Sequence, residues 1–171
     1  ADAGMGIADI DLIVVATSTP DFAFPATAAC VQQKLGSSQG AAFDVQAACS
    51  GFVYGMSLVT AMIETGQANG VLLIGAELMT RLLDWKDRST AVLFGDGAGA
   101  IALSGEDVGP DAPQVIKNYI RSAGEHTDLL YATGSANAAA KDAKIHMQGR
   151  EVYRHAVTNI AEAVTLSLIH I

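Results

Sequence analysis

Residues 71–76 form a run without a single polar side chain, reading VLLIGA. A second run at 11–17, DLIVVAT, is polar only at its two ends. Runs of this length that are rich in branched aliphatic residues are typical of strands covered on both faces. A sheet covered on both faces needs helices on either side of it. The sequence therefore predicts an α/β fold with a largely buried sheet.

The segments around these strands alternate between strand and helix patterns. A helix is predicted to start at Phe24-Pro25 and to run to Leu35, with Pro25 near the first helical position, where its missing N–H costs little, and Gly36 ending the helix. Another helix is predicted after a short apolar run at 43–45, with Gly66 closing it. The other expected segments are a charged loop or short helix at 84–89, a glycine-containing loop feeding a strand at 95–103, a polar turn at 104–114, a strand at 115–123, a flexible loop at 124–144 and a helix at about 148–165.

The connection at 42–52 carries a thiol among small residues. Its sequence, AFDVQAACSGF, places Cys49 at the first turn of the predicted helix. Free N–H groups and the positive end of the helix dipole stabilise a thiolate there and lower the pKa of a cysteine. Small neighbours leave room for a substrate carbonyl and for backbone N–H donors. Cys49 is therefore a candidate acyl-accepting nucleophile, and a structural cysteine packed between sheet and helix is the alternative interpretation.

Composition narrows the possible functions. The 171 residues are 50% hydrophobic and 16% charged, which suits one sizeable core and is too apolar for a disordered chain. The formal net charge of -8 argues against broad contact with nucleic acid or anionic membranes. No apolar run reaches the length of a membrane span and no secretory signal pattern occurs, so a cytoplasmic protein is expected. Two cysteines, Cys30 and Cys49, offer no disulfide framework and no metal-binding spacing.

A glycine triplet and three histidines are weighed as signs of nucleotide binding and of a catalytic base. The glycine triplet at 95–99 lacks the GxGxxG spacing of a dinucleotide site and leads into a strand-like run, where such a site needs a helix. A tight turn or a close backbone approach is the better interpretation. His126, His146 and His155 are interpreted as surface or packing residues, and a Cys–His pair built from one of them stays open as a minor alternative.

Two motifs together resemble one enzyme family. The sequences AACSGF at 47–52 and FGDGAGA at 94–100 resemble the β-ketoacyl-acyl-carrier-protein synthase III enzymes, the condensing enzymes that start bacterial fatty acid synthesis. Supporting similarity runs from 11–17 through 24–26 to 147–153 and covers nearly the whole chain up to about residue 165. The resemblance implies the thiolase fold, in which two similar α/β halves form α-β-α-β-α layers.

The resemblance also implies a reaction. An acetyl or other short acyl group passes from coenzyme A to Cys49, and malonyl-acyl-carrier protein then loses CO₂ and attacks the thioester to give a β-ketoacyl product. The coenzyme A thioester is a substrate in this scheme, and no permanently bound cofactor or metal is implied. The family's His and Asn motifs for the second step do not occur in this sequence. The chain by itself is therefore not expected to complete the condensation.

Other residues take implied roles from the same resemblance. Arg88 matches an arginine that packs against the adenine of coenzyme A, and the alternative is a loop cation paired with Asp84 or Asp87. Phe24 matches a residue that crosses a dimer interface to cap the partner's acyl pocket, with packing beside a proline as the alternative. The remaining implied positions are Phe94 in the acyl pocket, Gly149 in coenzyme A binding, and Arg150 and Arg154 against the acyl-carrier protein or the pantetheine phosphate.

The expected organisation is a partial thiolase-fold domain at 1–165 of a homodimeric enzyme, comprising the later part of the first half and the start of the second. Residues 166–171, LSLIHI, match the translation of a common sequencing adaptor and are expected to be an artefact, with an apolar continuation of the last helix as the alternative. A related condensing enzyme of secondary metabolism or hydrocarbon synthesis, and a non-catalytic partner subunit, are the other hypotheses. An intact Cys49 speaks against the last of these.

Overall fold

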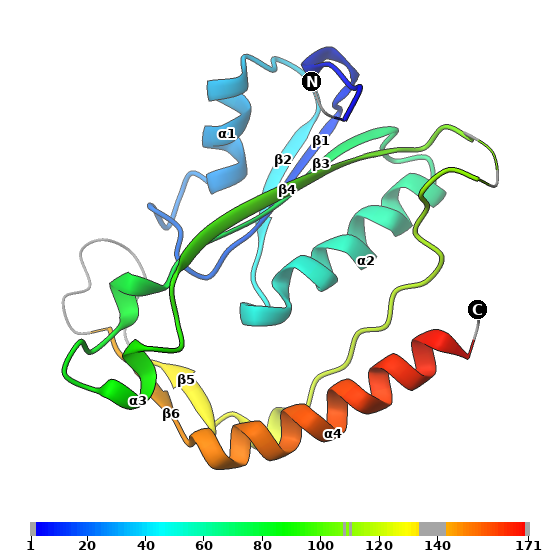
Figure 1. The fold of residues 1–171 in the computed structure, drawn as a ribbon. Helices are drawn as coiled ribbons and strands as arrows, with labels where there is room; N and C mark the ends of the chain where they lie inside the picture. Colours follow the sequence, from blue (N-terminus) through cyan, green and yellow to red (C-terminus); the bar gives the residue numbers. More distant parts are fainter. Residues whose placement is uncertain (1–2, 108, 110, 134–142, 170–171) are drawn as a thin grey trace.

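The computed structural model describes residues 3–107, 109, 111–133 and 143–169. Its largest unit is a four-stranded sheet in the order β2-β1-β3-β4 (Figure 1). The strands of this sheet are β1 (Leu12–Ala16), β2 (Ala41–Val45), β3 (Gly70–Leu78) and β4 (Asp96–Ser104). β1 pairs in parallel with β2 and β3, whereas β4 pairs antiparallel with β3 and forms one edge.

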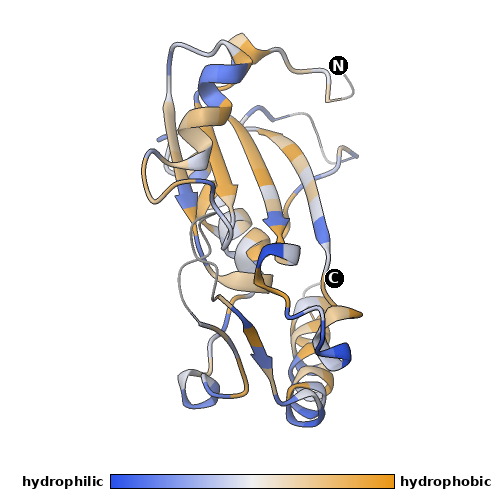
Figure 2. Cartoon of the chain, turned by 90° about the vertical axis from the view of Figure 1, so that its left-hand side faces the viewer, coloured by the Kyte–Doolittle hydropathy of each residue, from blue (hydrophilic) through white to orange (hydrophobic). Residues whose placement is uncertain are grey.

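Helices cover both faces of this sheet. The α-helices of the described residues are α1 (Thr27–Leu35), α2 (Gly51–Glu64), α3 (Arg88–Ala91) and α4 (Gly149–Leu168). α1 lies on one face of the sheet and α2 on the other (Figure 1). Because side chains alternate along a strand, Val14 packs with Val59 of α2 while the neighbouring Val15 packs with Ala28 of α1. Both central strands are coloured mainly as hydrophobic in Figure 2, and the predicted α/β fold with a buried sheet is confirmed.

An extended segment, residues 113–123, lies between α2 and α4 (Figure 1). The Tyr54 hydroxyl of α2 donates a hydrogen bond to the Arg121 carbonyl at 3.1 Å, and the Arg121 guanidinium pairs with Glu162 of α4 at 3.1 Å. α1, the sheet, α2, this segment and α4 therefore follow one another as successive layers. The predicted strand at 115–123 is wrong, because among the described residues no second strand lies beside this segment to complete a hydrogen-bonded ladder.

A small hairpin lies between the extended segment and α4 in the chain. β5 (Leu130–Ala132) and β6 (Ile145–Met147) pair antiparallel, and the 3₁₀ helix η4 (Gly124–His126) precedes them. The prediction of a flexible loop at 124–144 is therefore wrong at its start, while 134–142 lie outside the described residues. A buried cluster that includes Leu82 and Ile145 attaches the hairpin to the residues that follow β3.

The helix ends follow the sequence signals only in part. α1 begins two residues after Pro25, because Asp44 of β2 accepts hydrogen bonds from the Thr27 and Ala28 N–H groups at 2.7 and 2.8 Å and so caps the helix. The helix therefore starts later than predicted, and Pro25 lies just before its N-cap residue, Ala26. Gly36 ends α1 in the left-handed conformation at φ 73°, as predicted.

The boundaries of β4, α2 and α4 can also be compared with the predictions. β4 begins at Asp96, so two of the three glycines, Gly97 and Gly99, lie inside the strand and not in a loop, and they face Glu77 and Gly75 of β3. α2 ends at Glu64, just before Gly66, as predicted. α4 runs to Leu168, three residues beyond its predicted end, and so includes the start of 166–171 as a helical continuation.

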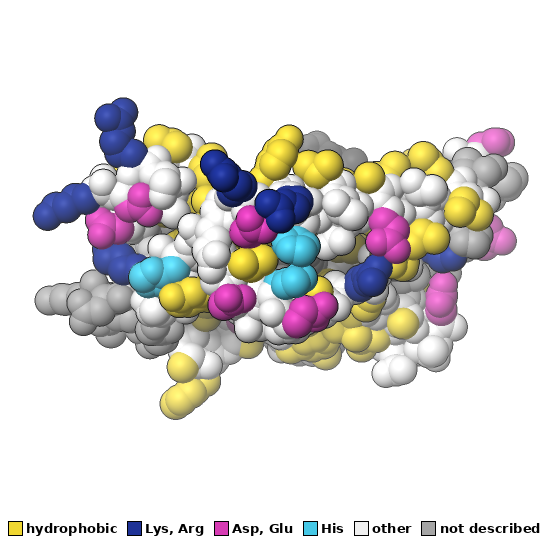
Figure 3. All heavy atoms as spheres, turned by 90° about the horizontal axis from the view of Figure 1, so that it is seen from below, with side chains coloured by type: hydrophobic (Ala, Val, Ile, Leu, Met, Phe, Trp, Pro, Cys, Tyr) yellow, Lys and Arg dark blue, Asp and Glu magenta, His cyan; other side chains and the backbone are white. Residues whose placement is uncertain are grey.

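The face on the α4 side carries charges of both signs. Figure 3 shows basic and acidic side chains interspersed along it. Among the described residues, no helix is both long and apolar enough to cross a bilayer. No group of three metal-ligating side chains comes together within the described ranges.

Candidate active site

Cys49 lies on a sharp connection between β2 and α2. β2 ends at Val45, and a 3₁₀ turn, η2 (Ala48–Ser50), leads directly into α2 at Gly51. Ala48 has a φ of 45°, which a non-glycine residue adopts only at some cost in strain. The turn therefore holds its backbone in a fixed, unusual shape that presents the Cys49 side chain at the surface.

The start of α2 is pressed closely against the sheet. A Cβ atom at Gly51 would lie 3.3 Å from the Cβ of Ala16, and one at Gly55 would lie 2.8 Å from Leu73 Cδ1. A side chain at Gly55 would require the Leu73 side chain to shift, so glycine allows the helix to approach β3 this closely. Within the described residues, no side chain caps the N-terminus of α2. The Gly51 N–H donates to the Ala48 carbonyl, so what the helix end offers Cys49 is the positive end of its dipole.

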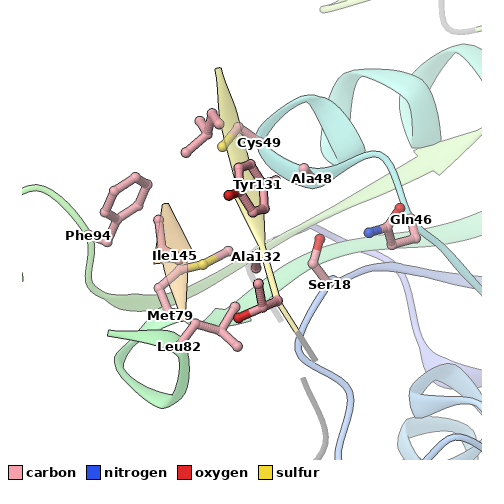
Figure 4. A pocket seen from close by; sticks show the side chains of 12 residues that line it. Ser18, Gln46, Ala48, Cys49, Met79, Leu82, Phe94, Tyr131, Ala132 and Ile145 are labelled. Carbon is pink, nitrogen blue, oxygen red and sulfur yellow. The ribbon is translucent and has the colours of Figure 1, made fainter. Parts of the chain in front are cut away.

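Cys49 lines a pocket of about 410 Å³ (Figure 4). Cys49 and Ala48 form one side of it, and a group of apolar side chains forms the opposite side. The lining residues are Ser18, Gln46, Ala48, Cys49, Met79, Leu82, Phe94, Leu130, Tyr131, Ala132, Thr133 and Ile145. An exposed thiol next to an apolar pocket suits attack on a thioester whose acyl chain enters that pocket.

Sequence reasoning did not find most of this pocket. Leu130 and Ile145 come from the β5–β6 hairpin; Leu130 lies in the region predicted to be a loop, and Ile145 lies just after it, where no element was predicted. The short alternating patterns at 130–132 and 145–147 were the signal that could have revealed the hairpin. Ser18, which follows β1, carried no signal of its own because it sits in an ordinary turn sequence.

Of the other predicted site residues, the structure brings Phe94 to Cys49. Phe94 is half-buried and lines the same pocket. Phe24 is 86% exposed and points away from the body of the chain, so it lines no pocket here with Cys49. Gly149 begins α4, immediately after the pocket-lining hairpin.

Three predicted basic residues, on α3 and in the first two turns of α4, are exposed. Asp87 caps α3 by accepting hydrogen bonds from Ser89 and Thr90, and these bonds, with the Ser89 hydroxyl first, hold the pKa of Asp87 below its usual value. Arg88 follows this cap and, among the described residues, forms no ion pair, so the pairing with Asp84 or Asp87 that was the alternative interpretation is not seen. Arg154 pairs with Glu151 at 3.1 Å on α4.

Arg150 is exposed in the first turn of α4. α3 packs against β6, and α4 follows β6 directly. Arg88, Arg150 and Arg154 are therefore all carried by elements that adjoin the hairpin of the Cys49 pocket.

The histidines lie elsewhere. The rings of His126 and His155 pack against each other with centroids 4.2 Å apart, in a separate cavity between α2 and α4. His146 stacks on Tyr131 at 4.9 Å. No histidine of the described residues lines the Cys49 pocket, so the alternative of a Cys–His pair finds no support.

The comparisons with known proteins agree on one family. The family model of 3-oxoacyl-[acyl-carrier-protein (ACP)] synthase III matches residues 43–124. The chain is 51% identical over 165 residues to the β-ketoacyl-[acyl-carrier-protein] synthase III of Novosphingobium aromaticivorans, which covers 95% of this chain and 51% of the relative. It is 53% identical over 165 residues to the enzyme of that name from Granulibacter bethesdensis, covering 96% of this chain and 51% of the relative.

Solved structures extend this agreement to three dimensions. The crystal structure of 3-oxoacyl-[acyl-carrier-protein] synthase III from Aquifex aeolicus matches with a TM-score of 0.83 and 38% identity over 94% of this chain and 49% of that one. The priming β-ketosynthase from the R1128 polyketide biosynthetic pathway matches with a TM-score of 0.78 and 32% identity over 94% of this chain and 48% of that one.

The layered fold and the cysteine turn thus define a thiolase-like α/β protein. The sequence identity places it more narrowly: the chain belongs to the 3-oxoacyl-[acyl-carrier-protein] synthase III family. Both the predicted family and the predicted fold class are confirmed. The chain spans about half the length of the curated relatives it matches.

Proposed function

We propose that this chain supplies the nucleophile of a β-ketoacyl-acyl-carrier-protein synthase III that begins fatty acid synthesis. The observation that carries the proposal is the exposed Cys49 thiol, which sits at the uncapped N-terminus of α2 on the wall of a largely apolar pocket. Because the chain spans about half the length of its relatives, we propose that residues 1–165 are the later part of the first half and the start of the second half of the whole enzyme. Tests of activity therefore use the full-length protein.

In the first step, the Cys49 thiolate attacks the carbonyl carbon of a short acyl-coenzyme A. The positive end of the α2 dipole faces the charge that develops at Cys49, so the proposed step uses no permanent base. The bond from the carbonyl carbon to the coenzyme A sulfur breaks, and coenzyme A leaves with the proton that Cys49 gave up. In the second step, malonyl-acyl-carrier protein loses CO₂, its carbanion attacks the acyl-Cys49 carbonyl, and the thiolate is released. That step needs donors beyond this chain, so residues 1–171 alone should not complete it.

The remaining residue roles follow the same proposal. Arg88 would contact the adenine end of coenzyme A and Gly149 its pantetheine arm, with Phe94 against the acyl chain. Arg150 and Arg154 would meet the acyl-carrier protein, since both are exposed cations on an element that adjoins the pocket hairpin. No resident cofactor is part of the scheme. A cytoplasmic location would suit these substrates.

Incubation of the full-length protein with acetyl-coenzyme A should label Cys49 and leave Cys30 unlabelled. Cys30 lies within α1, on the opposite face of the sheet from α2, whereas Cys49 lies at a helix N-terminus. Mass spectrometry of proteolytic peptides locates the acetyl group, and β-ketoacyl product formation with malonyl-acyl-carrier protein completes the test. Label on the Cys30 peptide, or none on Cys49, would contradict the proposed function.

A homodimer is also proposed, with a second copy pairing along β4. Among the described residues β4 is a nine-residue strand at the edge of the sheet, and such an edge can accept a further strand. We expect a dimer of the full-length protein in sedimentation velocity. Ile101→Lys, which places a charge on this edge, should shift it toward monomer, whereas Leu35→Lys on α1 should not. A monomeric wild-type protein, or an unchanged dimer with Lys at 101, would rule out this interface.

A priming condensing enzyme of a polyketide pathway is a second candidate, favoured by the 32% identity to the R1128 enzyme. Assays with the carrier protein of fatty acid synthesis against a pathway-specific carrier protein separate the two functions. Turnover with the first carrier supports the main proposal.

A further inference from the structure

The Cys49 pocket has a polar corner, which is made by Ser18 and Gln46. Ser18 follows the end of β1 and Gln46 follows the end of β2. These strands are parallel neighbours in which Ala16 pairs with Val45, so both residues emerge at the same edge of the sheet. In the sequence, Gln46 is only three residues before Cys49. The polar corner therefore adjoins the nucleophile turn, while the far side of the pocket is apolar (Figure 4).

The Ser18 hydroxyl is buried and, among the described residues, has no hydrogen-bond partner. It points toward the turn that carries Gln46 and Ala48 (Figure 4). Buried polar groups are almost always paired, so an unpaired hydroxyl on a pocket wall calls for a partner from outside the chain. A rotation of the hydroxyl about the Cα–Cβ bond of Ser18 is sufficient to turn it toward a bound molecule. The side-chain amide of Gln46 is exposed and likewise makes no hydrogen bond within the described residues.

Glu77 fixes the backbone on which Ser18 stands. One carboxylate oxygen accepts a hydrogen bond from the Ser18 N–H at 2.8 Å, and the other accepts one from the Thr19 hydroxyl at 2.7 Å. The Thr19 hydroxyl oxygen in turn accepts from the Leu78 N–H at 2.8 Å. On the other side, the Thr17 N–H donates to the Val45 carbonyl at 3.1 Å. The turn after β1 is thus held to β3 by Glu77 and to β2 by its own backbone.

We propose that the polar corner selects acyl groups that carry a hydroxyl on the carbon chain, and that Glu77 positions Ser18 for this contact. A hydroxyl of the substrate can accept a hydrogen bond from the Ser18 hydroxyl and donate one to the Gln46 amide oxygen. The methyl end of the acyl chain then meets the apolar side of the pocket. A site that hydrogen-bonds a substrate hydroxyl discriminates strongly against the analogue that lacks it. The substrate class inferred is a short hydroxyacyl-coenzyme A thioester. This inference rests on the proposed transfer of an acyl group to Cys49.

The test compares two thioesters that differ by one hydroxyl, 3-hydroxybutyryl-coenzyme A and butyryl-coenzyme A. Acylation of Cys49 in the full-length protein is followed by coenzyme A release and by intact mass. We expect the ratio of kcat/KM for the hydroxylated over the plain thioester to fall about tenfold in Ser18→Ala and in Gln46→Leu, which is the scale of one buried hydrogen bond. Glu77→Gln keeps one acceptor oxygen but weakens the pair of hydrogen bonds to Ser18 and Thr19. The ratio should therefore fall by a smaller factor in this variant.

Asp44→Asn is the matched control for Glu77→Gln. Asp44 also binds two groups through its two oxygens, but it caps α1 and does not line the pocket. A purely structural role for Glu77 predicts equal shifts in melting temperature for the two variants and no change in the ratio for either. A positioning role predicts that the ratio falls in Glu77→Gln alone.

The outcomes separate this inference from the proposed function. If acetyl-coenzyme A acylates Cys49 but the ratio is the same in wild type, Ser18→Ala and Gln46→Leu, the inference is wrong and the proposed function stands. If no thioester acylates Cys49 in the wild-type protein, both are wrong. Gln46 is exposed, so its variant keeps the test decisive even if Ser18→Ala fails to fold.

Discussion

Replacing Cys49 with alanine in the full-length protein should lower condensation activity at least about a thousandfold, because the covalent intermediate can no longer form. Removal of an attacking side chain that acts as part of a unit typically costs several orders of magnitude in kcat. Product formation from acetyl-coenzyme A and malonyl-acyl-carrier protein is the measurement. The Cys49→Ala protein should keep the melting temperature of the wild type to within a few degrees, since the Cys49 side chain is exposed.

Cys30→Ala is the matched control for this prediction. Cys30 is half-buried in α1 and removed from the pocket, so its variant should retain activity. Substantial product from Cys49→Ala would show that another group carries the acyl chain. Equal losses in the two variants would point to a general effect of removing a thiol.

Replacing Leu73 with alanine should destabilise the protein by about 2–5 kcal/mol, the usual range for a fully buried leucine. Leu73 of β3 has no exposed surface and packs in the core with Val14 and Val59. Its loss would leave a cavity under the first turns of α2, where its Cδ1 atom fills the space beside Gly55. Urea denaturation of the full-length protein measures the change in the free energy of unfolding.

Leu58→Ala provides the comparison. Leu58 lies on α2, the helix that packs over Leu73, but it is 38% exposed. Its substitution should cost less than about 1 kcal/mol, as surface changes usually do. Similar losses for the two leucines would mean that the sheet–α2 layer is not the principal core. A second transition in the Leu73→Ala curve would show that this layer unfolds separately from the rest of the protein.

The sequence contained enough information to predict the sheet and the turn that carries Cys49. Uninterrupted apolar runs have few alternatives to a doubly covered strand, which is why 11–17 and 71–76 were recognised. Cys49 was predicted because small residues between a strand and an amphipathic helix leave little choice of backbone path. In each case the structure is decided by neighbours close in the chain.

The pocket itself depends on contacts that no local pattern encodes. Ser18, Leu130 and Ile145 are far apart in the chain and meet only because β1 and the β5–β6 hairpin approach the same turn. The extended segment at 113–123 shows that a local pattern can also predict an element that does not form. Its residues have the composition of a strand, but a strand exists only where a neighbour completes the ladder, and among the described residues none does.

The position of β1 in the sheet has a consequence for how the protein is made. β1 is a central strand, yet both of its partners come later in the chain. At a synthesis rate of roughly 5–20 residues per second, β3 follows β1, about 60 residues later, after roughly 3–12 s. Throughout that interval five consecutive apolar residues of a growing chain have no completed sheet to enter. The yield of folded protein in a cell should therefore depend on what shields β1 during translation, and not only on the stability of the finished sheet.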